Sequence, residues 1–180
     1  FQRSPDSMIQ REQYNNFLKS VTDDLEGDWL VIGGSLLAII QAESRTTVDI
    51  DLCPLNEMTN ELRLSLMTVA QKAGLSIESI NPAADFFLKQ IPNWKSSIVL
   101  FISGQKGNLY RPSFELYLKL KIERLSQTDI EDCILYYKWN KENQLSAEYF
   151  EVLNQKIASE KIDDKVQSLQ KLMAALESLN

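Results

Sequence analysis

Two aspartates separated by one residue interrupt an apolar stretch, "TVDIDL". Asp49 and Asp51 alternate with the apolar side chains of Val48, Ile50 and Leu52. Such alternation is typical of a β-strand with one buried face, and it places both carboxylates on the opposite face. Residues i and i+2 of a strand lie about 6.6 Å apart, so the two carboxylates can converge on a hard cation or a metal pair. The pattern therefore predicts a divalent-cation site.

A solvated strand face with both aspartates in water is the alternative interpretation, and it suits an isolated Asp-x-Asp pair. Aspartate disfavours strands, however, and here two of them lie among strongly β-forming residues. Without a cation, the two carboxylates would repel each other. What precedes this strand in the sequence decides between the two interpretations.

Gly33, Gly34 and Ser35 lie between the apolar run "WLVI" and the helix-like run "SLLAIIQA". Glycines at a strand-to-helix junction let the backbone approach a ligand closely, and a helix N-terminus offers unpaired N–H groups to phosphate. Most Gly-Gly-Ser tripeptides are ordinary turns, so this one gains meaning only from the aspartates that follow. Together, the turn and the aspartates predict a site for a phosphate and its metal ion.

Composition excludes several kinds of chemistry. The 180-residue chain contains no histidine, which excludes Ser-His and Cys-His nucleophile pairs and every His-ligated metal centre. Its 25 acidic and 19 basic residues give a net charge of −6, which opposes non-specific attraction to a nucleic-acid backbone. Cys53 and Cys133 lack a CxxC spacing, and we expect both to be buried small hydrophobes.

The order of these motifs resembles a known signature. "GGS" followed after thirteen residues by "DID" is similar to the signature of the polymerase-beta-type nucleotidyltransferase superfamily. The chain more closely resembles the small bacterial AbiEii-like nucleotidyltransferases, which are linked to abortive infection and toxin–antitoxin systems. The resemblance runs from about Trp29 to about Tyr137. It is carried by two phrases, Arg45-x-Thr47-x-Asp49-Ile50-Asp51-Leu52 and Lys119-Leu120 with Arg124, Asp129 and Asp132.

The resemblance implies a role for each matching residue. Asp49 and Asp51 would be catalytic and would hold Mg²⁺ or Mn²⁺, with Lys119 as a catalytic cation at the phosphates. Superfamily members often use a third carboxylate as general base, and Glu78 is the candidate. The nucleotide-binding set would be Gly33, Gly34, Ser35, Arg45, Thr47, Asp129 and Asp132. A solvent-exposed helical lysine is the alternative for Lys119, and acidic residues favoured by a helix dipole are the alternative for Asp129 and Asp132.

The remaining sequence predicts a mixed α+β fold of the α/β type, a small mixed sheet flanked by helices with a C-terminal helical segment. By resemblance this is a minimal nucleotidyltransferase fold over residues 8–142, with a helical extension over 143–180 packed on the same domain. Thr128 and Glu131 suggest a capping box. Strands are expected at 29–32, 47–52, 75–80 and 96–102, a turn at 103–108, and helices at 14–25, from 35, at 58–73, 84–89, 114–125, from 128, and over 147–178.

These expectations define a leading function and two alternatives. The leading one is metal-dependent transfer of a nucleoside monophosphate from a nucleoside triphosphate to a hydroxyl group of RNA or protein, with a cognate toxin or antitoxin as partner. A non-catalytic, antitoxin-like regulator on the same fold is the second, and a plain interaction module is the third. No apolar run reaches the roughly 20 residues of a membrane span. We therefore expect a cytoplasmic protein without a membrane partner.

Overall fold

The computed structural model describes residues 5–40, 49–81, 84–140 and 145–180. The chain forms two compact units, the N-terminal unit Phe1–Pro112 and the C-terminal unit Ser113–Asn180. A five-stranded mixed sheet with flanking helices confirms the expected mixed α+β class. The predicted boundary between residues 142 and 143 lies outside the described residues, so that division stays a prediction. Within the described residues, no helix is both long enough and apolar enough to cross a bilayer.

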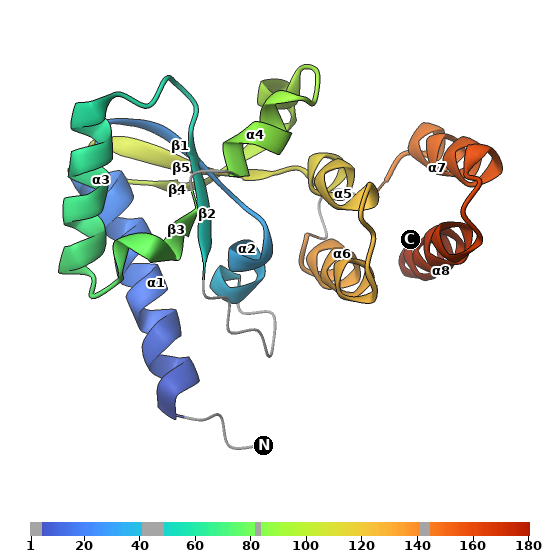
Figure 1. The fold of residues 1–180 in the computed structure, drawn as a ribbon, viewed down its shortest axis with the longest axis horizontal. Coiled ribbons are helices and arrows are strands. Elements are labelled where there is room, and N and C mark those ends of the chain that lie inside the picture. Colours follow the sequence, from blue (N-terminus) through green and yellow to red (C-terminus); the bar gives the residue numbers. More distant parts are fainter. Residues whose placement is uncertain (1–4, 41–48, 82–83, 141–144) are drawn as a thin grey trace. The chain divides into compact units, whose positions relative to one another are not determined.

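The sheet belongs to the N-terminal unit and has the strand order β3-β2-β1-β5-β4 (Figure 1). Its strands are β1 Gly27–Ile32, β2 Ile50–Pro54, β3 Ile80–Asn81, β4 Ile98–Ser103 and β5 Gly107–Pro112. β1 pairs antiparallel with β2 and parallel with β5, while β2–β3 is parallel and β4–β5 antiparallel. The register of β4 shifts between Leu100 and Ile102, which marks a bulge or irregularity in this strand at the edge of the sheet.

The two strands nearest the candidate site follow their sequence patterns. The continuous apolar run of β1 is buried from Trp29 to Ile32, as suits a central strand covered on both faces. In β2 the alternation is confirmed for the described residues, because Ile50 and Leu52 are buried while Asp51 is only half-buried. The strand ends at Pro54, two residues beyond the expected range of 47–52.

Four helices accompany the sheet: α1 Pro5–Asp24, α2 Gly34–Ile39, α3 Asn60–Lys72 and α4 Ala84–Lys89. Helix α1 packs on β5, β4 and α3, and α4 contacts β2. Figure 1 shows this arrangement, with α1 in blue, α3 in teal and α4 in green. Phe17, Leu18 and Val21 of α1 are fully buried, which confirms the amphipathic spacing read from the sequence.

The prediction of a strand over residues 75–80 is wrong for most of that segment. Ile77–Ser79 form a 3₁₀ turn, η1, and only Ile80 and Asn81 form a strand. The backbone N–H of Ser79 donates to the carbonyl of Ser76 at 3.0 Å, which closes the turn. The Ser79 hydroxyl also bonds Ser76 Oγ at 3.4 Å, and local bonding of this kind competes with the formation of a strand. A second 3₁₀ turn, η2, spans Trp94–Ser97.

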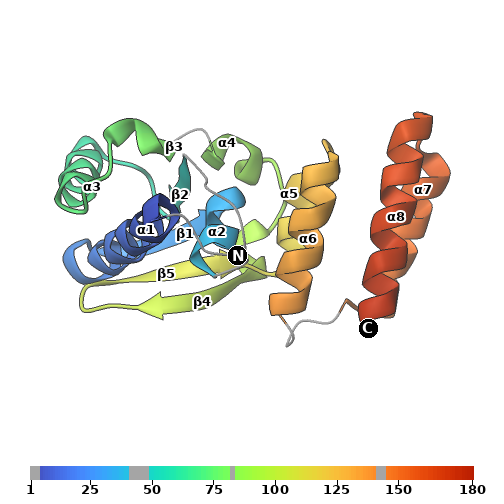
Figure 2. The same ribbon diagram turned by 90° about the horizontal axis from the view of Figure 1, so that it is seen from below.

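The C-terminal unit consists of α5 Phe114–Ile122, α6 Gln127–Trp139, α7 Ala147–Ser159 and α8 Asp163–Leu179. Segment 114–125 is thus mainly helical, as its Leu, Lys and Glu content predicts. Helix α6 packs against α5 and α8, and α7 packs against α8; Figure 2 shows the α7–α8 pair in red tones. Leu169, Leu172 and Leu176, spaced by three and four, are the buried residues of α8.

The capping box predicted from Thr128 and Glu131 is wrong. The N-cap of α6 is Ser126, whose Oγ accepts a hydrogen bond from the backbone N–H of Asp129 at 3.2 Å. The Asp129 carboxylate in turn accepts from the backbone N–H of Ser126 at 2.9 Å. Both boxes fit the sequence, but Asp129 is also bonded by basic side chains of α5 and the segment after it, which favours the earlier start.

We predict that Ser126→Ala lowers the free energy of unfolding by about 1 kcal/mol, because the helix loses its N-cap hydroxyl. Thr128→Ala is the matched control and should stay within about 0.5 kcal/mol of the parent, since Thr128 is exposed. Urea denaturation of the three proteins at one pH measures both values. Equal losses in the two variants would contradict this assignment of the cap.

Candidate active site

The turn after β1 is in direct contact with the second aspartate of the "DID" strand. Ile32, the last residue of β1, is the antiparallel partner of Asp51. Gly33 has φ +72° and ψ −161°, and a Cβ built on it would lie 2.0 Å from Asp51 Oδ2. A side chain at position 33 would therefore strain the backbone and displace the Asp51 carboxylate. The glycine turn and the aspartate strand adjoin, as the sequence pattern predicts.

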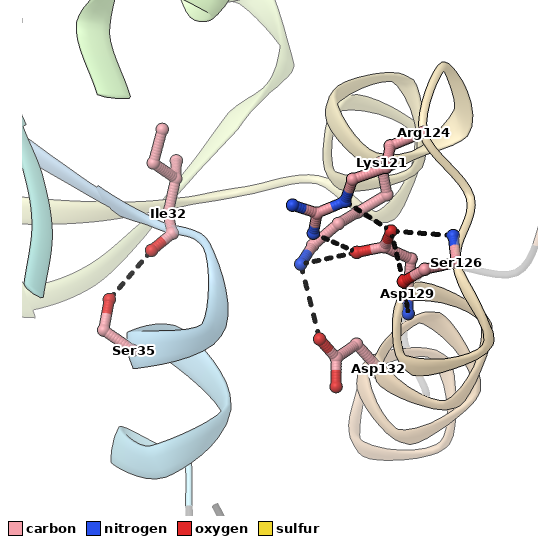
Figure 3. A network of polar contacts seen from close by, with 7 residues as sticks. All are labelled: Ile32, Ser35, Lys121, Arg124, Ser126, Asp129 and Asp132. Atoms are coloured by element: carbon pink, nitrogen blue, oxygen red, sulfur yellow. Dashed lines mark hydrogen bonds and ion pairs between the residues drawn. The ribbon is translucent and has the colours of Figure 1, made fainter. Parts of the chain in front are cut away.

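Ser35 fastens the same turn to the same strand. Its Oγ donates to the carbonyl of Ile32 at 2.9 Å (Figure 3) and accepts from the backbone N–H of Asp51 at 3.2 Å. The residue is only 1% exposed. The first bond uses the hydroxyl's only hydrogen and the second uses an oxygen lone pair, so the Ser35 side chain links β1 to β2 at the site. Contact of Gly33, Gly34 or Ser35 with phosphate stays a prediction, and Gly33 and Gly34 are half-buried.

Asn81 is a site residue that the sequence interpretation missed. It is the parallel β-partner of Asp51 on β3, and its Nδ2 donates to Asp51 Oδ1 at 2.8 Å. The resemblance to enzymes with a third carboxylate favoured Glu78 in this segment over a neutral amide. The sequence offers no local signal for Asn81, because the pairing of β2 with β3 determines this contact.

The other residues predicted near the aspartates have different outcomes. Asp49 is exposed and directly precedes β2. Glu78 is exposed on η1 and does not lie on a strand beside Asp51, so the structural basis for choosing it as general base is wrong. Glu78 lies on this 3₁₀ turn because the neighbouring serines favour local hydrogen bonds over strand pairing. Arg45 and Thr47 lie outside the described residues, and their nucleotide-binding roles stay predictions.

The DxxD pair of the C-terminal unit lies in a separate ionic network, the α5–α6 cluster, defined as Lys121, Arg124, Asp129 and Asp132. Asp129 is 0% and Asp132 1% exposed. Lys121 Nζ lies 3.3 Å from a carboxylate oxygen of each aspartate. Arg124 donates two hydrogen bonds to the Asp129 carboxylate, from Nε at 2.8 Å and from Nη2 at 2.6 Å. Figure 3 shows these contacts, which balance two negative charges with two positive ones.

This cluster lowers the pKa of the Asp129 carboxyl. Burial alone raises the pKa of that carboxyl. Hydrogen bonds from Arg124 and Ser126 and the charge of Lys121 lower it by more, so the pKa of Asp129 lies well below its ordinary value. The carboxylate is thus a stable anion that links α5 to α6 and caps α6.

Lys119, the lysine that the resemblance selects, is exposed on α5. The ion pairs to Asp129 and Asp132 come instead from Lys121, two positions further on. The structure gives Asp129 and Asp132 a clear role in folding. The catalytic role of Lys119 and the nucleotide contacts of the two aspartates stay predictions.

Both cysteines are free and buried, as expected. Burial, with smaller contributions from the charges of Asp85 and Asp51, raises the pKa of the Cys53 thiol to about 12. Burial likewise raises the pKa of Cys133 to about 12. Neither sulfur is a thiolate at neutral pH, so neither acts as a nucleophile there.

The donor set fits a hard divalent cation. Asp49 and Asp51 offer carboxylate oxygens, which Mg²⁺ and Mn²⁺ prefer, and Mg²⁺ sites commonly use one or two carboxylates with water and phosphate oxygens. A carboxylate has about four acceptor positions, so the bond from Asn81 is compatible with a metal bond at Asp51. Gly33 has no Cβ to cover Asp51 Oδ2.

No protein-family model, curated protein or solved structure matches this chain. Assignment of the site therefore depends on the contacts of Asp51 with Gly33, Ser35 and Asn81, together with the motif resemblance.

We predict that Gly33→Ala destabilises the protein more than Gly27→Ala does. Both glycines have positive φ, +72° and +97°, so each substitution carries about 1–3 kcal/mol of backbone strain. A Cβ at Gly27 meets nothing within 4 Å, whereas at Gly33 it overlaps the carboxylate of Asp51. Chemical denaturation should show an additional loss of about 1–3 kcal/mol for Gly33→Ala. Equal losses would mean that the contact with Asp51 is not a constraint.

The low pKa of Asp129 predicts a pH dependence of stability. Its folded pKa lies below the unfolded value of about 3.9, so its stabilising contribution is complete above about pH 5 and is lost as the pH falls through the acid range. Asp129→Asn should lower the free energy of unfolding by about 1–3 kcal/mol at pH 7 and by less at pH 3. The contribution of Arg124 is screened, since its side chain is 73% exposed.

Urea denaturation between pH 7 and pH 3 measures this difference. The control is Glu131→Gln on the exposed face of the same helix, which should follow the parent protein at every pH. A constant offset between Asp129→Asn and the parent across the range would contradict the predicted linkage.

Proposed function

We propose that this protein is a metal-dependent nucleotidyltransferase that moves a nucleoside monophosphate from a nucleoside triphosphate to a hydroxyl group of RNA or a protein. The observation that carries the proposal is the contact of Gly33 with the carboxylate of Asp51. It places the backbone of the glycine turn against a carboxylate with the chemistry of a metal ligand. The motif resemblance supplies the reaction class.

In this proposal, Asp49 and Asp51 hold Mg²⁺ or Mn²⁺, and the backbone around Gly34 and Ser35 faces the β- and γ-phosphates. The ion supplies charge neutralisation for the triphosphate. The acceptor hydroxyl loses its proton to water, its oxygen forms a bond to the α-phosphorus, and pyrophosphate leaves with the electrons of the broken P–O bond. Little covalent chemistry is required of the chain, whose residues position the reactants.

Five further residues enter the proposal by resemblance alone. Lys119 would contact phosphate, and Arg45 and Thr47 would contact the nucleotide. Contacts of the Asp129–Asp132 pair with nucleotide would have to coexist with the α5–α6 cluster. The cellular context proposed is phage defence or a toxin–antitoxin pair, with a cognate toxin or antitoxin as partner.

A second candidate is a regulator that binds nucleotide and metal without transferring anything. One observation favours it: the side chain bonded to Asp51 from the neighbouring strand is the amide of Asn81. An amide is not a proton acceptor of useful basicity at neutral pH, so it cannot serve as general base for an attacking hydroxyl. Binding and transfer therefore need separate measurements.

We predict that the wild-type protein binds a nucleoside triphosphate in the presence of Mg²⁺, and that Asp49→Asn or Asp51→Asn weakens this binding by about tenfold or more, because each removes a charged oxygen ligand. The matched control is Asp28→Asn, since Asp28 also accepts an asparagine amide within the sheet, from Asn108 at 2.9 Å. Calorimetric titration with each of the four triphosphates measures the affinities. Wild-type affinity in Asp51→Asn would contradict the proposed site.

Transfer is measured with α-labelled triphosphates and total cellular RNA or protein as acceptor. Label on an acceptor with the wild type but not with Asp51→Asn supports the enzyme. Metal-dependent binding without label on either acceptor class favours the regulator.

A further inference from the structure

Both oxygens of the Asp51 carboxylate lie against other segments of the N-terminal unit. Asn81 Nδ2 donates to Oδ1 at 2.8 Å, and Oδ2 lies against Gly33, 2.0 Å from where a Cβ would be. The backbone N–H of Asp51 is bonded to Ser35 Oγ at 3.2 Å. These contacts come from two segments of the N-terminal unit, the turn after β1 and strand β3, and the contacts with Asn81 and Gly33 limit the direction in which the carboxylate points.

The chemistry of the Asn81 contact fixes its polarity. An ionised carboxylate only accepts hydrogen bonds, so the amide nitrogen of Asn81 and not its oxygen faces Asp51. Because the amide is neutral, the bond orients the carboxylate without cancelling its charge. A lysine or arginine at position 81 would orient it equally well but would compete with a bound cation for the same negative charge.

We infer that Asn81 is a positioning residue for the divalent cation, acting through the orientation of the Asp51 carboxylate. The inference rests on the proposed function, because it assumes that Asp51 is a metal ligand. Partners that orient metal ligands without touching the ion contribute about 10–100-fold to metal affinity. Substitution of Asn81 removes one of the contacts that orient the Asp51 carboxylate.

The sheet contains a natural control for this inference. Asn108 Nδ2 donates to Asp28 Oδ1 at 2.9 Å between neighbouring strands, the same chemical contact as Asn81 with Asp51. Asn108 also accepts a hydrogen bond from Ser103 Oγ at 2.8 Å. Asn108→Ala therefore removes the bond to Asp28 and also the bond from Ser103. It leaves the candidate site unchanged.

The experiment titrates Mn²⁺ alone into the full chain and into Asn81→Ala, Asn81→Ser, Asn108→Ala and Asp51→Asn. Calorimetry gives the affinity, and the relaxation rate of water protons reports the water ligands left on the bound ion. We expect Asn81→Ala and Asn81→Ser to bind Mn²⁺ about 10–100-fold more weakly than the wild type and to leave more water on the ion. Asn108→Ala should match the wild type in both readouts.

Two outcomes separate this inference from the function on which it rests. Wild-type Mn²⁺ affinity and hydration in the Asn81 variants, with clear loss in Asp51→Asn, would overturn the role of Asn81 and leave the metal site intact. Unchanged Mn²⁺ binding in Asp51→Asn, or none in the wild type, would overturn both. If both Asn81 variants fail to fold, nuclear magnetic resonance of the wild type decides. Mn²⁺ should then broaden the side-chain amide signals of Asn81 and spare those of Asn108, and equal response of the two would overturn the inference.

Discussion

The contact between the backbone of Gly33 and the carboxylate of Asp51 constrains everything around the candidate site. It requires glycine at position 33, both for the positive φ and for the missing Cβ. It also requires the register that sets Ile32 opposite Asp51, since a slip of one residue would turn the aspartate into the other face of the sheet. The Ser35 hydroxyl, bonded to both strands, holds that register at the point where α2 begins.

Two aspartates in this protein illustrate two uses of a carboxylate. Asp129 is fully buried and is compensated by Lys121 and Arg124, so its charge is balanced where it lies. Asp51 is half-buried and accepts a hydrogen bond from the neutral amide of Asn81 on β3, which orients the group without adding an opposing charge. The first arrangement stabilises a junction between helices. The second would serve the proposed function by orienting a metal ligand.

The sequence alone predicted the elements whose patterns are local. The alternation around Asp51 and the glycine turn after β1 needed no tertiary information, because strand periodicity and backbone freedom are properties of short segments. The prediction of the α6 cap was wrong because two overlapping capping boxes fit the sequence equally well. The ion pairs to Asp129 favour the box that begins at Ser126. Neither β5 nor Asn81 was predicted, since Gly107 and Pro112 resemble loop residues and a partner across a sheet is fixed only by pairing.

The irregular register of β4 has a consequence for the protein's behaviour in a crowded solution. This last strand, "IVLFIS", carries no charge, and Leu100 is 52% exposed. A regular strand of that composition would offer a continuous row of backbone donors and acceptors, the kind of template on which chains self-associate. The shift between Leu100 and Ile102 interrupts the row at its most apolar point. Restoration of a straight strand there would favour intermolecular sheet growth even if the native fold became no less stable.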